Sequence, residues 1–312
     1  MENKHIPVMI EEIKSYIPVN KELNIIDATF GGGGYSKIFL ENFKIGKLIA
    51  IDRDPLSNFF AKKLSEKYNN FKLINGCFGE IDNLIENDNL NNKTQFDLII
   101  FDLGLSTNQL EDPKRGFSFL TNSPLNMGMG NNKKTVLDVI NNYSENELAD
   151  ILYKFGEEKF SRKIAKKIIN ARKIKDIENT KELSLLIKKS YKNKSKIDPA
   201  TRTFQALRIY VNDELNELSK ALEKSLNLLK VKGKIIIVSF HSLEDRLVKD
   251  FFNHNSGKRW RSSRHYPELA DDGPITLKLI TKKLIRPSDL EININPRSRS
   301  ARLRVAEKIS IN

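Results

Sequence analysis

Short, uninterrupted apolar runs recur through the first hundred residues of the chain and return once more after residue 230. They are rich in Ile, Leu and Val and lack polar alternation, which is typical of strands buried on both faces of a sheet. Segments with helical spacing separate them, as in "YSKIFLENF" and "PLSNFFAKKLSEKY". Because such alternation builds a mostly parallel sheet covered by helices, the sequence predicts an α/β, doubly wound core. The predicted strands span residues 24–27, 47–52, 71–76, 96–104 and 233–241.

The alternation stops after the fourth run. More than a hundred residues, mostly with helical patterns, separate that run from the fifth, and one crossover helix needs far fewer. We therefore predict an inserted helical subdomain over 111–199, between two parts of the core at 1–110 and 200–312. The insertion contains the basic stretches "SRKIAKKIINARK" and "KKSYKNKSK", and the C-terminal "ITLKLITKKLI" and "SRSARLRVAEKI" are predicted to form a strand pair.

A run of four glycines lies between the first strand and the first helix, in "IIDATFGGGGYSKIFL". Glycine permits a sharp turn and a close approach of the backbone to another molecule. Three of the strands end in acids, Asp27, Asp52 and Asp102. The carboxyl ends of parallel strands share one edge, where ligands bind, so these acids are expected to converge. Asp52 follows Gly31 by about 20 residues, the spacing of an acid that holds a ribose hydroxyl.

Several ligands were considered for this edge. The glycine run fits the dinucleotide motif imperfectly, because Ser36 stands in place of the last glycine, and no phosphate-binding G-K-[ST] follows. Three carboxylates would repel a pyrophosphate but suit a ligand with a ribose diol, an amino group and a positive centre. S-adenosylmethionine has all three and is the predicted cofactor. An NAD-dependent oxidoreductase is a remote alternative, and Asp27 and Asp102 as caps or turn residues are another.

Charge and cysteine content bound the partners and the compartment. Lys and Arg (53) exceed Asp and Glu (40), for a net charge of +13, which predicts an anionic partner, RNA or DNA first; drift in composition is the alternative. A single cysteine, Cys77, excludes an intramolecular disulfide and a thiolate zinc site, and the histidines show no metal-ligand spacing, so no metal is predicted. With no apolar stretch near the roughly 18 to 20 residues that span a bilayer, and no secretory signal, the expected location is cytoplasmic.

Several blocks together resemble a known family. "DATFGGGGYS", "FDLGLSTNQLED", "TRTFQALRIYVNDEL", "VSFHSLEDRLVK" and "NPRSRSARLRVAE" are similar to the RsmH (MraW) family, in the family's order, over nearly the whole chain. The resemblance implies a class I (Rossmann-like) methyltransferase sheet and an rRNA (cytosine-N4-)-methyltransferase that uses S-adenosyl-L-methionine. It also implies cofactor contacts at Gly33, Gly34, Tyr35, Asp52, Phe78, Asp102 and Gln109.

Two departures from the family pattern bear on function. Tyr35 stands where the family has histidine, which is compatible with a contact made by the backbone. The family's P-L-D-M-R-M-D is here "PLNMGMG", so Asn126, Gly128 and Gly130 replace an acid, an arginine and a polar or acidic residue. An arginine fork cannot be replaced by glycine. An altered target or an inactive RNA-binding or ribosome-assembly factor is therefore the alternative to an active enzyme, unless neighbouring lysines compensate.

The chemistry expected at the site is methyl transfer to the N4 amine of a cytidine in small-subunit (16S) ribosomal RNA. That amine is a poor nucleophile, so it needs an oriented hydrogen-bond acceptor, either Asp102 or His241. Alternatively, Asp102 only orients the cofactor. His241 can likewise be a strand-end residue that is bonded to Glu244 or Asp245. The sequence leaves open whether the substrate is free rRNA or an assembled subunit, and which nucleotide is modified. It also leaves open the oligomeric state, which includes a homodimer. The candidate RNA contacts are Arg115, Arg202, Arg208 and Trp260.

Overall fold

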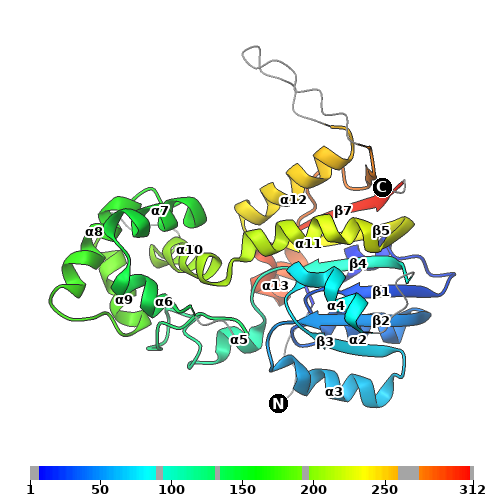
Figure 1. Cartoon of the computed structure of the whole chain (residues 1–312), viewed down its shortest axis with the longest axis horizontal. Coiled ribbons are helices and arrows are strands. Elements are labelled where there is room, and N and C mark those ends of the chain that lie inside the picture. Colours follow the sequence, from blue (N-terminus) through cyan, green and yellow to red (C-terminus); the bar gives the residue numbers. More distant parts are fainter. Residues whose placement is uncertain (1–6, 89–93, 131–133, 192–196, 259–273, 310–312) are drawn as a thin grey trace, which may run out of the picture. The chain divides into compact units, whose positions relative to one another are not determined.

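The chain divides into two compact units. Residues Met1–Gly104 and Leu215–Asn312 form one, called here the sheet unit, and Leu105–Glu214 form the other, called the helical unit (Figure 1). No described helix is both long and apolar enough to cross a membrane. The computed structural model describes residues 7–88, 94–130, 134–191, 197–258 and 274–309.

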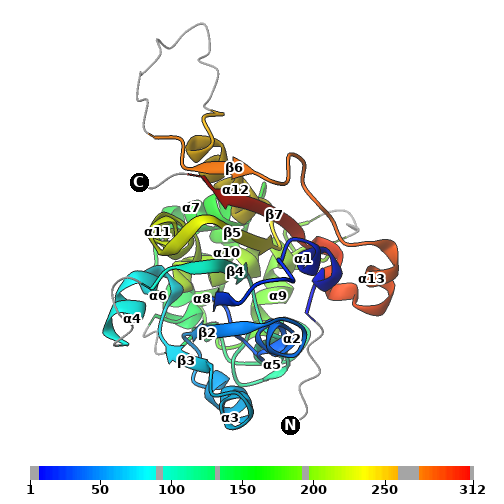
Figure 2. The same cartoon turned by 90° about the vertical axis from the view of Figure 1, so that its right-hand side faces the viewer.

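The sheet unit is built on seven strands in the order β3-β2-β1-β4-β5-β7-β6. The first five in that order are parallel, whereas β7 runs antiparallel to both β5 and β6. Figure 2 shows the sheet as a column with β6 at the top and β3 at the bottom. The strands are β1 (Leu23–Asp27), β2 (Ile45–Asp52), β3 (Phe71–Asn75), β4 (Phe96–Asp102), β5 (Leu229–Ser239), β6 (Leu277–Leu279) and β7 (Arg302–Lys308). This arrangement confirms the predicted α/β class, the five strands and the C-terminal strand pair.

Helices cover both faces of the sheet, which is why its strands are apolar throughout. Ile25 and Leu98 belong to the core on one face, and their neighbours Ile26 and Ile99 to the core on the other. The first face is covered by α1 (Ile10–Ser15), α2 (Gly34–Asn42) and α3 (Ser57–Lys67), and the second by α4 (Ile81–Asn87), α11 (Glu214–Leu228) and α12 (Ser242–Asn255). Three short elements complete the unit: η1 (Phe78–Glu80), α13 (Asp289–Ile294) and η2 (Pro296–Ser300).

The helical unit has a hydrophobic core of its own, formed by buried side chains such as Leu152, Ile168 and Leu207. Capping boxes begin three of its helices, at Ser106, Thr135 and Ser144, and each satisfies backbone N–H groups that the helix leaves open. Its helices are α5 (Thr107–Glu111), α6 (Val136–Asn142), α7 (Glu145–Gly156), α8 (Ser161–Arg172), α9 (Thr180–Lys188) and α10 (Ala200–Asn212).

The units divide the chain at different residues from the expected boundaries. The expected insertion spans 111–199, whereas the division falls after Gly104 and after Glu214. The main reason is α10, which was expected to return to the sheet. It contributes Phe204 and Leu207 to the helical core, and it lies so close to α7 that a Cβ on Gly156 would be 2.6 Å from the Arg202 carbonyl oxygen.

A buried carboxylate stabilises the amino end of the sheet. Asp97, near the start of β4, accepts the backbone N–H of Asn24 at 2.9 Å and the ammonium groups of Lys21 at 2.7 Å and Lys230 at 2.8 Å. Burial opposes ionisation of this carboxyl, but these donors outweigh it and hold its pKa below the usual value. Asp97 is therefore neutralised locally by two lysines.

We expect Asp97→Ala to lower the free energy of unfolding by about 2–3 kcal/mol, because it leaves a buried N–H and two ammonium groups without their acceptor. Urea denaturation measures this. Glu66→Ala, an exposed acid on α3, is the matched control and should change the free energy of unfolding by less than about 0.5 kcal/mol. Equal stability of the two variants would contradict the role given to Asp97.

Candidate functional site

The glycine run forms the turn from β1 into α2. Gly33 precedes α2 with φ of +78°, and its N–H donates to the Phe30 carbonyl at 2.7 Å. A side chain there would be strained in φ and would place its Cβ 2.7 Å from the Phe30 ring. The turn therefore requires glycine at position 33. Residues 31–34 are all glycines, so this stretch of backbone has no side chains of its own.

Asp27 ends β1 and is fully buried. Its Oδ2 accepts the Ser36 hydroxyl at 2.6 Å and its Oδ1 accepts the Thr29 N–H at 3.3 Å. Burial raises its pKa to about 6, despite these hydrogen bonds, which act in the opposite direction. Both donors are neutral, so the carboxylate is hydrogen-bonded without being neutralised.

Asp52 ends β2 and holds the glycine turn. Its Oδ2 accepts the Gly31 N–H at 2.6 Å and its Oδ1 accepts the Asp54 N–H at 2.8 Å. Burial raises its pKa to about 6, and the negative charges of Asp54 and Asp27 add to that effect. β1 and β2 are parallel neighbours with Asp27 opposite Ala50, so the acids that end these two strands lie at the same edge of the sheet.

Asp102 ends β4, and its backbone N–H donates to the Thr29 hydroxyl at 2.6 Å. Its Oδ1 is buried and has no hydrogen-bond partner among the described residues. Burial raises its pKa well above the usual value, and the charges of Asp27 and Glu244 raise it further. A buried acceptor without a donor is costly, and such an atom at a strand end marks a place where a ligand can supply the missing interaction.

These observations test whether the residues fit the predicted cofactor. The three acids end neighbouring strands; Asp27 is buried, and Asp52 and Asp102 are half-buried. Asp27 and Asp52 accept only neutral donors, and Asp102 Oδ1 has no donor among the described residues, so a positive group beside them would relieve their mutual repulsion. The glycine turn has no side chains of its own, and Asp102 offers an oxygen without a hydrogen-bond partner among the described residues. The edge therefore fits a sulfonium-bearing nucleoside such as S-adenosylmethionine.

The two aromatic candidates are fixed by packing. The buried Tyr35 donates its hydroxyl to the Val8 carbonyl at 2.5 Å, which ties α2 to the segment before α1. Burial, with the charges of Asp102, Asp27 and Glu291, raises the pKa of Tyr35 well above its usual value. Phe78 packs edge-to-face on Phe101, with ring centroids 5.9 Å apart. The Tyr35 side chain is thus occupied within the protein, which agrees with a contact made by its backbone.

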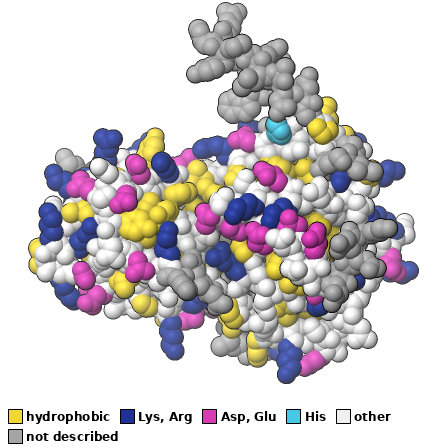
Figure 3. Space-filling model, viewed as in Figure 1, with side chains coloured by type: hydrophobic (Ala, Val, Ile, Leu, Met, Phe, Trp, Pro, Cys, Tyr) yellow, Lys and Arg dark blue, Asp and Glu magenta, His cyan; other side chains and the backbone are white. Residues whose placement is uncertain are grey.

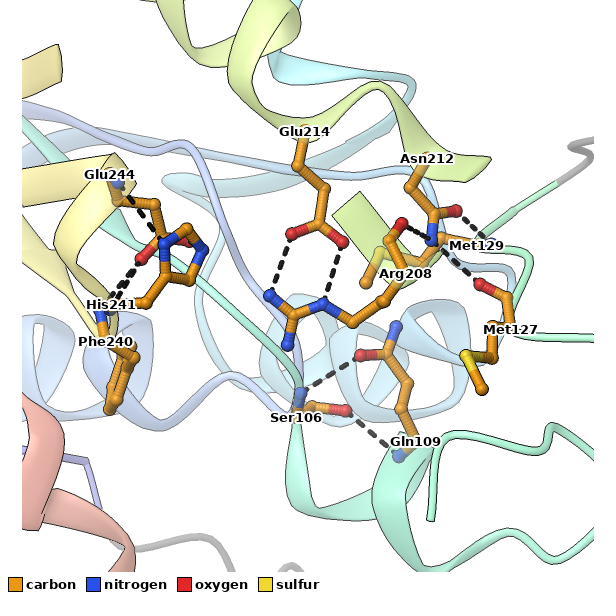
Figure 4. A network of polar contacts seen from close by, with 10 residues as sticks. All are labelled: Ser106, Gln109, Met127, Met129, Arg208, Asn212, Glu214, Phe240, His241 and Glu244. Carbon is orange, nitrogen blue, oxygen red and sulfur yellow. Dashed lines mark hydrogen bonds and ion pairs between the residues drawn. The ribbon is translucent and has the colours of Figure 1, made fainter. Parts of the chain in front are cut away.

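His241 begins α12 and pairs with Glu244 (Figure 4). Its Nδ1 accepts the Glu244 N–H at 3.3 Å, and its Nε2 lies 3.0 Å from Glu244 Oε1. Glu244 Oε2 also accepts the N–H of Phe240 at 2.8 Å. Nε2 itself is buried and has no hydrogen-bond partner among the described residues. This geometry corresponds to the alternative interpretation of His241 as a residue bonded to Glu244, and its role as a base stays a prediction.

Gln109 belongs to the helical unit. It is buried on α5, where its Oε1 accepts the Ser106 N–H at 3.0 Å and its own N–H donates to the Ser106 hydroxyl at 3.3 Å (Figure 4). The side-chain oxygen thus completes a capping box. Its predicted cofactor contact stays a prediction.

The divergent segment 124–130 is well held within the helical unit. Met127 and Met129 are buried, while positions 126, 128 and 130 alternate with them on the outer side. Asn212 donates to the Met127 carbonyl at 2.8 Å and accepts the Met129 N–H at 2.8 Å (Figure 4). The segment keeps its conformation without the family's charged residues.

Asn126 replaces an acid in that segment without loss of its local contact. Its Oδ1 accepts the Gly128 N–H at 2.9 Å, a turn that asparagine and aspartate form equally well. Gly128 offers only its backbone, and its carbonyl accepts Arg115 at 3.1 Å. What the segment lacks is charge on its outer side.

The predicted RNA-contacting arginines have partners inside the helical unit. Arg115 donates to the Gly128 carbonyl, and Arg202 to the Glu157 carbonyl at 3.2 Å. Arg208 forms a bidentate pair with Glu214, with both distances 2.9 Å (Figure 4). Trp260 lies outside the described residues. The RNA contacts of these residues stay predictions.

Sequence reasoning missed three participants in the edge, Thr29, Ser36 and Glu244. The two hydroxyls hold Asp102 and Asp27, and the Glu244 charge acts on Asp102. The signal for the hydroxyls was their position close after β1, with Thr29 in the turn and Ser36 in the first turn of α2. Glu244 stands three residues after a strand-end histidine, the spacing of a capping box, but nothing in the sequence places it near Asp102.

The strand order with an antiparallel β7, the glycine turn after β1 and the acids ending β1, β2 and β4 define a class I S-adenosylmethionine-dependent methyltransferase. Comparison with known proteins agrees. A model of the MraW methylase family matches residues 2–309. The chain belongs to that family, which confirms the resemblance seen in the sequence.

Curated relatives cover almost the whole chain. A protein of Rickettsia bellii named ribosomal RNA small subunit methyltransferase H is 44% identical over 312 residues, covering 99% of this chain and 100% of that protein. One of the same name from Methylorubrum extorquens is 41% identical over 308 residues, covering 98% and 87%. A putative rRNA-methylase structure from Clostridium thermocellum covers 99% of both chains at 12% identity with a TM-score of 0.45, too weak a likeness to support an inference.

We expect Asp52→Ala to weaken S-adenosylhomocysteine binding roughly tenfold to hundredfold, since a hydrogen bond to a charged group contributes about 1.5–3 kcal/mol. Isothermal titration calorimetry measures the affinity, and circular dichroism checks that the fold is retained. Glu66→Ala on α3 should bind as the unmodified protein does. Unchanged affinity in Asp52→Ala would remove this residue from the site.

Cofactor binding should depend on pH in a way that reports the charge of the ligand. The pKa values of Asp27 and Asp52 are raised from 3.8 to about 6, so ionising these groups destabilises the folded protein. In the free protein, the stability that their protonated forms contribute at pH 4 is lost as the pH rises through 6. A cationic ligand offsets that cost. We expect S-adenosylmethionine to raise the melting temperature more at pH 7.5 than at pH 5, and the neutral S-adenosylhomocysteine to show a smaller difference. Equal pH dependence of the two ligands would contradict the electrostatic account.

Proposed function

We propose that this protein is an S-adenosylmethionine-dependent rRNA (cytosine-N4-)-methyltransferase of small-subunit (16S) ribosomal RNA. The observation that carries the proposal is membership of the MraW methylase family over residues 2–309, with relatives named ribosomal RNA small subunit methyltransferase H. The acidic edge of the sheet supports it independently, because its chemistry suits a sulfonium ligand. The proposed partner is ribosomal RNA, free or within the small subunit, and the proposed location is cytoplasmic.

The residues of the edge divide the work of binding. Asp52 lies where it can accept hydrogen bonds from ribose hydroxyls while it holds Gly31, and the backbone at Gly33 and Gly34 lines the turn. Phe78, oriented by Phe101, provides an apolar face for the adenine. When bound, S-adenosylmethionine supplies an electrophilic methyl group on a positively charged sulfur.

Asp102 is the residue best placed to act on the target amine. The free Oδ1 can accept a hydrogen bond from the cytosine amine, which orients the nitrogen and increases the availability of its lone pair. Alignment of this kind can contribute about 7–11 kcal/mol, and a proton acceptor about 10²–10⁴-fold. Acceptance requires ionised Asp102, and a positive charge beside the carboxyl lowers its raised pKa toward that state.

The alternatives receive less support. The inactive-factor interpretation rested on the segment 124–130, but that segment keeps an ordered backbone through Asn126 and Asn212, and the acids of the sheet edge are all present. An oxidoreductase using NAD would place a pyrophosphate beside Asp27, Asp52 and Asp102, which carry no neutralising donor among their contacts. No observation favours either alternative.

The experiment that tests the function is transfer of a labelled methyl group to small subunits isolated from cells that lack this protein. We propose that one cytidine acquires N4 methylation, which mass spectrometry of digested RNA locates. Free 16S RNA as a parallel substrate distinguishes an assembled subunit from bare RNA. Cofactor binding without transfer to either substrate would favour the inactive factor.

We expect Asp102→Asn to lower kcat by about 10²-fold or more, because the amide cannot accept a proton, while the amide oxygen keeps part of the hydrogen bonding. Single-turnover assays with saturating RNA and cofactor measure this. If Asp102 only orients the cofactor, the variant would instead lose S-adenosylmethionine affinity and keep its kcat. Full activity with unchanged affinity would exclude both roles.

A further inference from the structure

The basic residues of α8 divide into two sets, of which the first is structural. Lys163 and Lys167 donate to the carbonyls of Ser190 at 2.5 Å and Lys189 at 2.6 Å, at the C-terminal end of α9. Arg172 donates to two carbonyls at the end of α6, at 2.6 and 2.5 Å. The last carbonyls of a helix lack partners and carry negative partial charge, so these cations stabilise α9 and α6.

The second set has no such partner. Arg162, Lys166 and Lys173 are exposed, as is Lys159 just before the helix. Within the described part of the chain, the side chains of these four residues form no hydrogen bond or ion pair. Their charges are therefore available to another molecule.

Arg162, Lys166 and Lys173 lie along one side of α8, and Lys159 precedes the helix. At 3.6 residues per turn, Arg162, Lys166 and Lys173 fall within about 40° of one another around the helix axis. The buried Ile164 and Ile168 point to the opposite side. Arg162 and Lys166 are about 6 Å apart along the axis, and the row extends about 16 Å to Lys173. We call Lys159, Arg162, Lys166 and Lys173 the α8 stripe.

A polyanion fits such a stripe better than a single charged ligand does. Over residues 105–214 there are 21 Lys and Arg against 14 Asp and Glu, a modest excess, and Figure 3 shows both signs interspersed over the helical unit on the visible face. Charge count alone therefore marks no site. A row of single-sign, unpaired side chains on a rigid helix does, because it matches successive phosphates of a nucleic acid backbone.

We propose that the α8 stripe binds the phosphate backbone of the substrate RNA, an inference that rests on the proposed function. The arginines singled out from the sequence differ from the stripe, because Arg115, Arg202 and Arg208 each have a partner within the helical unit. The stripe supplies affinity without reading bases, and it leaves recognition of the target cytidine to other residues.

The test compares two triple variants with the same loss of charge. Arg162→Ala/Lys166→Ala/Lys173→Ala removes most of the stripe. Lys62→Ala/Lys249→Ala/Lys283→Ala, three exposed lysines of the sheet unit without contacts among the described residues, is the control. Equilibrium binding to unmethylated 16S RNA is measured between 50 and 200 mM salt, and KM and kcat with the same RNA.

The stripe variant should bind RNA at least tenfold more weakly at low salt. Its salt dependence should be shallower by about 2 in the slope of log K against log salt, since each lost phosphate contact reduces the slope by about 0.7 to 0.9. KM for RNA should rise while kcat at saturating RNA and S-adenosylhomocysteine affinity stay unchanged. Arg162→Lys/Lys166→Arg/Lys173→Arg, which keeps the charges, should retain RNA affinity.

Three results would overturn the proposal: RNA affinity equal to that of the unmodified protein, equal weakening in both alanine variants, or loss of affinity in the charge-preserving variant. Unchanged RNA affinity is also the result expected if the α8 stripe binds an acidic protein instead of RNA. RNA binding is measured without turnover, so the binding result can be interpreted even if the protein does not methylate RNA. The unfolding midpoints of all variants should equal that of the unmodified protein, which verifies that the substitutions leave the fold intact.

Discussion

The structure depends on how buried carboxylates at the two ends of one sheet are compensated. At the amino end, Asp97 is neutralised by two lysines and its pKa falls. At the carboxyl end, Asp27 and Asp52 accept hydrogen bonds only from neutral hydroxyl and N–H donors, and their pKa values rise to about 6. Burial is similar in kind at both ends, so the difference lies in the missing cation. The protein leaves a positive charge to be supplied by its ligand, and accepts lower stability at that edge in return.

That arrangement would also distinguish the cofactor before the reaction from the cofactor after it. The charges of Asp27 and Glu244 oppose the ionisation of Asp102, and a sulfonium beside this carboxyl would lower that cost. Methyl transfer turns the sulfonium into a neutral thioether, so the same edge no longer has a compensating charge. The interaction is therefore stronger before the reaction than after it, which favours exchange of the spent cofactor.

Much of this could be predicted from the sequence, because strands buried on both faces and acids at their ends are local signals. β1 to β4 were placed within two residues at each end, and the edge acids followed from them. The start of β5 at Leu229 was missed by four residues, since "LKVKGK" is polar and lacks the apolar pattern. α10 lies on the other side of the observed division from the expected one, because its amphipathic pattern shows that it is buried but not which elements cover it. The same limit affected the arginines: Arg208 is as basic as Arg162 in sequence, and only the fold shows that Glu214 neutralises one of them.

The two units differ in the sign of the charge that they leave uncompensated, and this difference suits the two parts of the substrate. The sheet edge has unneutralised carboxylates, which would repel a phosphate, so the RNA backbone gains nothing there. The helical unit has unpaired cations on α8, which attract phosphates but do not contact the neutral face of a base. A cytidine that leaves its stack separates its uncharged base from its charged backbone by the length of a nucleoside. The uncompensated charges of each unit, taken separately, therefore suit a different part of the proposed substrate: the cations of α8 suit its phosphates, and the acidic edge suits its uncharged base.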